Sequence, residues 1–275
     1  MVKFRHMLII IVIILGLIVG SLLNAVIYRL RSGDKLILSR SKCVHCQHSL
    51  GIGDLIPILS FILLKRRCRY CQKPISWQYP LVEFFCAIIF ILGYFRFLHP
   101  YLSKAPAGSV WSAEILAPLP AFLIFLVFSS FLIIIFVYDL KHYLILDQVT
   151  LSALVFAFIA NYLLGFTLGN LLIASLIIAG FFLLQFIISK GKWIGGGDIR
   201  LGLVMGAMLG WPNGLVALFL AYILGAMVGL ILIAGKQKHL GDQLPFGTFL
   251  SLATVITLLY GEAILKWSLT QARLL

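Results

Sequence analysis

The hydrophobic positions of this chain form long continuous blocks separated by short polar segments. Such blocks, about 20 residues long, have the length of a bilayer-spanning helix. The sixth block is short and glycine-rich, and Pro212 follows it, which predicts a tight helical hairpin with the seventh. We predict eight transmembrane helices, over residues 7–30, 81–99, 118–138, 149–165, 170–188, 199–211, 214–234 and 246–265.

Composition supports a membrane location. The 275 residues are 62% hydrophobic and 11% charged, whereas soluble domains carry about 25% charged residues. The first block follows basic residues, as in a signal peptide, but it is too long for one and has no small-residue cleavage site, so we expect a retained helix. The sequence therefore predicts an all-α polytopic membrane protein.

The distribution of Lys and Arg predicts the orientation. These residues are concentrated in the segment 31–80. If alternate loops face the same side of the membrane, most of the chain's 22 Lys and Arg residues lie on the same side as this segment. The positive-inside rule then makes this side cytoplasmic and both termini external. The net charge of +13 reflects this bias and attraction to anionic lipid. We expect the lipid bilayer as a partner, and no nucleic acid.

Four cysteines in the segment 31–80 form two CxxC pairs, CVHC and CRYC. This spacing is typical of a structural Zn²⁺ site with four thiolate ligands. Two disulfides are the alternative, but they suit an oxidising compartment, whereas this loop faces a reducing one. We predict a zinc domain at 31–80 between a first helix at 1–30 and a membrane domain at 81–275. Its ligands are Cys43, Cys46, Cys68 and Cys71.

Two of the nine acidic residues fall at one membrane face. In the predicted topology, Asp139 closes the third span and Asp198 opens the sixth, both on the cytoplasmic side. Two carboxylates in one low-dielectric site share a single proton, so one can activate water while the other protonates a scissile amide. Asp147 is the competing first carboxylate, although it resembles the N-cap of the fourth span. For Asp198, an N-cap role after a flexible glycine loop is the alternative.

Several motifs in order resemble the type IV prepilin peptidases, membrane aspartic proteases of the GxGD type. The resemblance covers nearly the whole chain and includes the paired CxxC motifs. It implies that Asp139 and Asp198 are catalytic, supported by Gly195, Gly196, Gly197 and Glu83. Arg200 stands where the family usually has lysine. The other matching stretches are GSLLNAVIYRL (20–30), YPLVE (79–83), the Asp-x₇-Asp stretch 139–147, GGGDIRLG (195–202) and LPFGTF (244–249).

The resemblance implies an endopeptidase of the bacterial inner membrane. Its substrates would be prepilins or pseudopilins, with a basic leader and a hydrophobic helix, cleaved at the cytoplasmic face. Many members of the family also methylate the new N-terminus with S-adenosylmethionine, an activity that rests here on the resemblance alone. Glu83 and the zinc loop are the places where we would look for it.

Two other classes of function stay open from the residues. Buried carboxylates also serve proton- or ion-coupled transporters, but here they cluster at one face and no inverted repeat is evident. A non-catalytic, zinc-bearing assembly scaffold is the second alternative.

Overall fold

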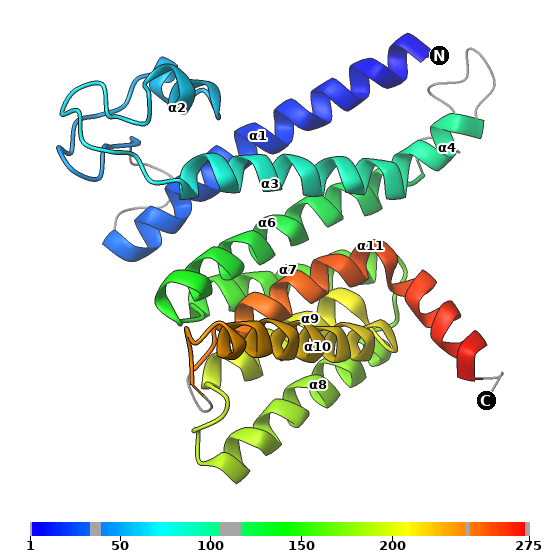
Figure 1. Ribbon diagram of the computed structural model, residues 1–275. Helices are drawn as coiled ribbons and strands as arrows, with labels where there is room; N and C mark the ends of the chain where they lie inside the picture. Colours follow the sequence, from blue (N-terminus) through cyan, green and yellow to red (C-terminus); the bar gives the residue numbers. More distant parts are fainter. Residues whose placement is uncertain (1, 34–39, 105–116, 240–242, 273–275) are drawn as a thin grey trace. The chain divides into compact units, whose positions relative to one another are not determined.

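The structure, a computed structural model, describes residues 2–33, 40–104, 117–239 and 243–272 (Figure 1). Within these residues every regular element is a helix, and the cysteine loop adds two isolated β-bridges. The all-α class predicted from the sequence is therefore confirmed for this part of the chain. The chain divides into two compact units, Met1–Ile133 and Ile134–Leu275. The functional division into 1–30, 31–80 and 81–275 is a different partition, and it stays a prediction.

The first unit is built on two long helices, with the cysteine loop between them in the sequence. The loop contains the short elements η1 and α2, and the second long helix continues through a π-helical turn, η2, into α4. The elements are α1 (Val2–Ser32), η1 (Ile52–Asp54), α2 (Leu59–Leu63), α3 (Gln78–Gly93), η2 (Tyr94–Leu98) and α4 (His99–Lys104).

Glycines bring the backbones of α1 and α3 together. A Cβ atom on Gly16 would lie 2.5 Å from the Cα of Ala87, and one on Gly20 would lie 2.6 Å from the Cα of Glu83. Small residues allow such close approach between membrane helices, where van der Waals packing drives association. The two helices lie side by side as a result (Figure 1).

The second unit contains the helices from α7 to α11 and the C-terminal part of α6. The boundary between the units falls within α6, so the last turns of α6 belong to the second unit. The helices are α6 (Leu119–His142), α7 (Asp147–Leu163), α8 (Leu168–Ser189), α9 (Gly196–Leu209), α10 (Asn213–Ala234) and α11 (Phe246–Ala272).

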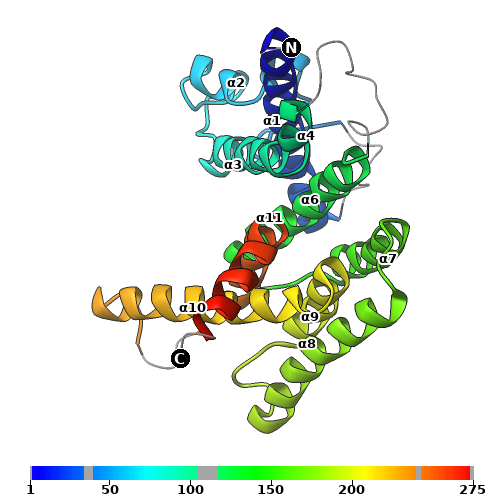
Figure 2. The ribbon, with the colours of Figure 1, turned by 90° about the vertical axis from the view of Figure 1, so that its right-hand side faces the viewer.

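Helix α9 forms the centre of the second unit. It packs against α7, α8 and α11, and Figure 2 shows it beside α7 and α8. A Cβ atom on Gly206 would lie 2.3 Å from the backbone of Ser175, and one on Gly202 would lie 2.8 Å from the Phe182 ring. These two glycines therefore allow α8 to pack directly on α9. Almost every residue from Leu201 to Leu209 is buried.

The eight predicted spans all coincide with helices, but eight membrane crossings are not confirmed. Six helices are long and apolar enough to cross a bilayer among the described residues. The other two are α7, a shorter apolar helix of 17 residues, and α9, with 14 residues. At 1.5 Å per residue, α9 extends only about 21 Å, less than the roughly 30 Å hydrocarbon core. Because protein surrounds α9, its length is not matched to lipid.

The two ends of α9 have different surroundings. At its C-terminal end, the Asn161 amide donates to the carbonyls of Ala207 and Met208, and Asn170 exchanges hydrogen bonds with the backbone of Trp211. Only three residues separate α9 from α10, so the connection is as short as expected, and the packing of the two helices as a hairpin stays a prediction. The N-terminal end of α9 lies near the end of α6 and the start of α11, where the acidic residues are found.

Candidate active site and metal centre

Asp139 lies in the last turn of α6 and is buried. Its Oδ2 atom accepts hydrogen bonds from the backbone N–H of Thr248, at 2.8 Å, and from the Thr248 hydroxyl, at 3.2 Å. Thr248 lies in the first turn of α11, where backbone N–H groups have no partner within the helix. A segment 109 residues away in the chain therefore holds the carboxylate at the end of α6.

Asp198 lies in the first turn of α9 and is also buried. Its Oδ2 atom accepts the backbone N–H of Gly195 at 3.1 Å, which is a capping contact within its own helix start. The capping role considered for Asp198 from the sequence is thus present. It does not exclude a second role, because Asp139 lies close enough for the two charges to interact.

Ile145 separates the helix starts around these carboxylates. A Cβ atom on Gly197 would lie 2.9 Å from the Ile145 Cβ, and one on Gly247 would lie 2.7 Å from its Cδ1 and 3.0 Å from the Asp139 Oδ2. Both glycines are thus needed for close packing, at the start of α9 and of α11. Gly196, in contrast, has open space where its Cβ would be.

The competing carboxylate, Asp147, has a different partner. It forms an ion pair with Arg200 and is exposed, with 56% of its side-chain surface accessible. The expected N-cap role is wrong by one residue: Leu146 is the N-cap of α7, and Asp147 is its first helical residue. An acidic residue still interacts favourably with a helix start there. Among the described residues of the second unit, Asp139 and Asp198 are then the two buried carboxylates.

The four loop cysteines lie together in the first unit. Their sulfur atoms are all within 4.8 Å of one another, and the Cys43 and Cys71 sulfurs are 3.9 Å apart. Tetrahedral coordination with Zn–S bonds of about 2.3 Å separates neighbouring sulfurs by about 3.8 Å, so the donor set fits one zinc-sized ion. All four are free thiols, which leaves the disulfide alternative without support in the structure.

The two CxxC pairs have the same backbone structure. In each, the N–H of the first cysteine bonds the carbonyl five residues later: Cys43 to His48 and Cys68 to Lys73, both at 2.9 Å. In each, a glutamine four residues after that cysteine takes a left-handed conformation, with φ of 58° at Gln47 and 56° at Gln72. Each pair is therefore a tight knuckle that presents two sulfurs to a shared point.

The thiols differ in how easily they ionise. Burial would raise the pKa of Cys43, but the backbone N–H groups of Cys46 and His45 point at its sulfur and lower this pKa to about 7. For Cys71, the Lys73 N–H acts to lower the pKa, but burial and the neighbouring sulfurs raise it to about 11. Four thiolates in one cluster repel one another, which a bound dication would relieve.

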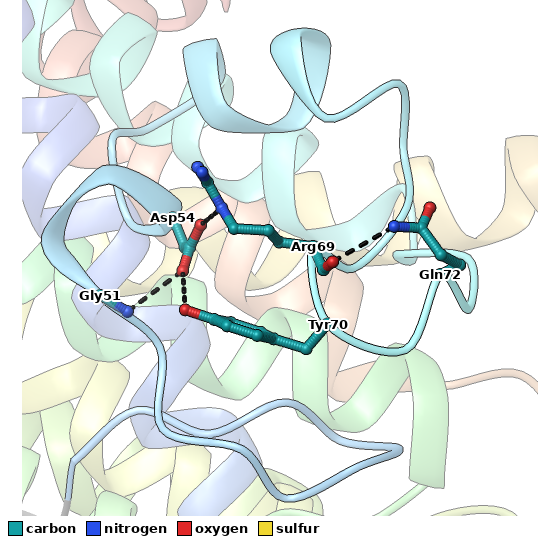
Figure 3. Close-up of polar contacts among 5 residues, drawn as sticks. All are labelled: Gly51, Asp54, Arg69, Tyr70 and Gln72. Atoms are coloured by element: carbon teal, nitrogen blue, oxygen red, sulfur yellow. Dashed lines mark hydrogen bonds and ion pairs between the residues drawn. The ribbon is translucent and has the colours of Figure 1, made fainter.

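Asp54 connects the segment after the first knuckle to the second knuckle (Figure 3). Its carboxylate accepts from the Arg69 Nε at 2.8 Å, the Gly51 N–H at 3.1 Å and the Tyr70 hydroxyl at 3.3 Å. Burial opposes ionisation, but the Gly51 and Arg69 donors outweigh it and lower the pKa of Asp54. The Tyr70 ring also stacks on His48, with centroids 3.7 Å apart.

Glu83 lies apart from the cysteines, on the buried side of α3. Its Oε2 atom accepts the backbone N–H of Ile58 at 2.7 Å, and the Ser21 hydroxyl of α1 is a second partner. Ile58 is the N-cap of α2. Glu83 therefore connects α1, α3 and the cysteine loop within the first unit.

Sequence reasoning assigned no role to three residues around these sites, Ile145, Thr248 and Asp54, and it expected Asp54 to be solvated, whereas its side chain is only 6% exposed. Thr248 stands inside the LPFGTF stretch, so that motif was a usable signal for it. Ile145 lies inside the Asp-x₇-Asp stretch at a position that the motif does not specify, and Asp54 lies in no motif. Their importance comes from contacts with residues that are distant in the chain or lie in another turn of the loop.

Comparisons with known proteins cover nearly the whole chain. Residues 14–97 match the bacterial peptidase A24 N-terminal domain, and residues 126–230 match the type IV leader peptidase family. The chain is 33% identical to a prepilin leader peptidase/N-methyltransferase of Aeromonas hydrophila, with 94% of this chain and 93% of that protein covered. It is 31% identical to the protein of the same name from Bacillus subtilis (strain 168), with 95% of this chain and 98% of that protein covered. No solved structure matches the chain.

Proposed function

Because the chain belongs to the type IV leader peptidase family, we propose that it is a membrane-embedded aspartic endopeptidase that removes the leader peptides of prepilins or pseudopilins. The family predicted from the sequence is confirmed. The substrate class follows from the names of the relatives.

Asp139 and Asp198 are the proposed catalytic pair. The observation that carries this assignment is that both carboxylates are buried around one side chain: Ile145 packs against Gly197, next to Asp198, and against Gly247, whose Cβ position lies 3.0 Å from the Asp139 Oδ2. Two such groups hold one proton between them, and water is then the nucleophile without a catalytic metal. Gly197 supports the pair through its packing on Ile145.

The proposed location is the bacterial inner membrane, with the site at the cytoplasmic face. The positive-inside rule supports this orientation, and the six helices able to span a bilayer, counted over the described residues, support the membrane location. In this topology α7 and α9 complete eight passes through the protein, with α9 enclosed by other helices. A prepilin helix would dock among the spans and present its basic leader to the pair.

The metal in the cysteine cluster is proposed to be a structural Zn²⁺ bound by Cys43, Cys46, Cys68 and Cys71. Four thiolates favour zinc over harder cations. The 50-residue loop has little core of its own, and a metal supplies the missing folding free energy. The ion would fix the two knuckles, and no proton transfer at the carboxylates passes through it.

We also propose N-methylation of the new N-terminus, with S-adenosylmethionine as the methyl donor. The double names of the relatives support this activity. Replacing Glu83 with Gln tests whether its carboxylate serves methylation: methylation is then lost while cleavage continues. Because Gln preserves an acceptor for the Ile58 N–H, the helix connection remains.

The decisive experiment incubates the purified protein in detergent with a prepilin, with and without the methyl donor, and reads the products by mass spectrometry. The expected result is a shortened pilin, methylated only when the donor is present. The Asp198→Asn variant should yield neither product. A transporter or a scaffold would leave the prepilin intact even with the unaltered chain.

A further inference from the structure

The two carboxylates differ in the number and source of their hydrogen-bond donors. Asp139 accepts from the N–H and the hydroxyl of Thr248, both on Oδ2, and the Gly247 N–H is a third donor. These donors all come from the first turn of α11.

Asp198 is bound more weakly. Within the residues that the structure describes, its carboxylate accepts a single hydrogen bond, from the Gly195 N–H at 3.1 Å. Asp198 lies at the start of α9, and Asp139, although it stands in the last turn of α6, accepts from the start of α11; each carboxylate therefore faces a helix N-terminus, where the dipole favours a negative charge. The difference between them is therefore the set of donors, and donors to a carboxylate stabilise its charged form.

We propose that Thr248 is a positioning residue that holds Asp139 ionised, so that Asp139 is the base of the reaction and Asp198 carries the shared proton. This inference rests on the proposed peptidase function. It assigns separate roles to two residues that the family resemblance treats only as a pair.

The reaction then follows in two balanced steps. As the water oxygen bonds to the scissile carbonyl carbon, Asp139 takes a proton from the water and Asp198 gives its proton to the carbonyl oxygen. When the C–N bond breaks, the nitrogen receives the proton held by Asp139, and a hydroxyl of the intermediate returns a proton to Asp198. Both aspartates end in their starting states.

Other titratable groups near the pair have partners of their own. The Tyr222 hydroxyl of α10, which interacts electrostatically with Asp198, exchanges hydrogen bonds with Gln185 at 2.9 and 3.0 Å. Arg200 of α9 forms its ion pair with Asp147. On α6 itself, Lys141 and His142 follow Asp139, and both have interactions of their own. The first turn of α11 adds donors but no titratable side chain.

The test compares Thr248→Val, which removes the hydroxyl donor, with Thr248→Ser, which keeps it. Thr254→Val is the matched control, because Thr254 is buried in the same helix and its hydroxyl bonds only its own helix, at the Leu250 carbonyl. Initial rates of leader cleavage are measured over a pH series for each full-length variant. Thr248→Ala removes the same donor with a smaller side chain, if the valine variant does not fold.

In the proposed arrangement, Thr248→Val lowers kcat roughly 10- to 100-fold, as expected for a hydrogen bond to a charged group, with little change in KM. The acidic limb of the pH profile moves up by about one unit, because Asp139 has lost a donor to its charged form. Thr248→Ser restores both kcat and the position of the acidic limb, and Thr254→Val has the same kcat and pH profile as the unaltered chain.

A shift of the alkaline limb instead would make Asp139 the proton carrier and overturn the assignment. Equal losses in Thr248→Val and Thr254→Val, with no limb moved, would reduce Thr248 to a packing residue. Failure of the proposed function would look different: the unaltered chain itself would then leave the prepilin intact.

Discussion

The cysteine cluster and the carboxylate pair are built in opposite ways. The four cysteines come from two knuckles within 29 residues of chain, and each knuckle fixes its own geometry through backbone bonds that recur at the same spacing. The carboxylate site joins the end of α6, the start of α9 and the start of α11, with one hydrogen bond spanning 109 residues. The first arrangement is local and the second is tertiary.

This difference predicts how each site fails. A local knuckle tolerates changes elsewhere in the chain, but it depends on each ligand and on the bound ion. A tertiary site depends on the close approach of helix starts, so a single methyl group at the contact can displace it. Function and metal content should therefore respond to different substitutions.

The largest expected effect is that of Asp139→Asn. Asn cannot accept the proton of the attacking water, so leader cleavage should fall more than about 10³-fold. Asp147→Asn, which removes only the exposed partner of Arg200, should retain most of the activity. Rates are measured with a prepilin in detergent, and metal analysis should show unchanged zinc in both variants. Normal cleavage by Asp139→Asn would show that the carboxylate at the end of α6 takes no part in catalysis.

A second, smaller effect compares two adjacent glycines. Gly197→Ala places a Cβ 2.9 Å from the Ile145 Cβ, and overpacking of this kind costs about 1–3 kcal/mol. The resulting shift of Asp198 should lower cleavage roughly 10- to 100-fold. Gly196→Ala meets open space and should leave activity within about twofold. Equal rates for the two variants would show that the helix start tolerates the displacement.

The cysteine cluster is easier to predict from the sequence than the carboxylate pair, because its geometry depends on residues that are close together in the chain. The spacing of Cys43, Cys46, Cys68 and Cys71 is sufficient to bring the four sulfurs together, because tight knuckles need only nearby residues. The eight helical segments were also predictable, since apolar blocks form helices wherever they avoid water.

The residues that sequence reasoning overlooked act through contacts between elements. Thr248 bonds Asp139 only once α11 starts beside the end of α6, and no pattern in either helix encodes that pairing. The same holds for Ile145, which lies between Gly197 and Gly247. The number of crossings also depends on packing, because protein rather than lipid surrounds most of α9.

The metal site should respond to its own ligands alone. Cys46→Ser removes one of four thiolates and should lower zinc content from one ion per chain to well below one, with looser protection of residues 43–75 in hydrogen exchange. Cleavage should fall less than in Gly197→Ala, because the carboxylate contacts are intact. Cys86→Ala, which changes a buried cysteine of α3 outside the cluster, is the control and should keep its zinc. Full zinc in Cys46→Ser would contradict a four-cysteine site.

The smallest effect concerns Asp54, which adds a side-chain contact to the local site. Asp54→Asn removes the ion pair with Arg69, whose side chain is 56% exposed. The cost should be only about 1 kcal/mol in the local stability of the loop.

Because the folded-state pKa of Asp54 lies below its usual value, the stability that its carboxylate contributes is complete above the unfolded pKa of about 3.9. This contribution is lost only as pH falls through the folded-state pKa. Hydrogen exchange of residues 51–75 should therefore show the same difference between Asp54→Asn and the unaltered chain at every pH from about 5.5 to 8. An Arg69→Gln variant should show a similar loss, and the double variant little more, since both remove one interaction. A difference that shrinks between pH 8 and 5.5 would mean that Asp54 takes up a proton in that range, contrary to the hydrogen bonding seen around it.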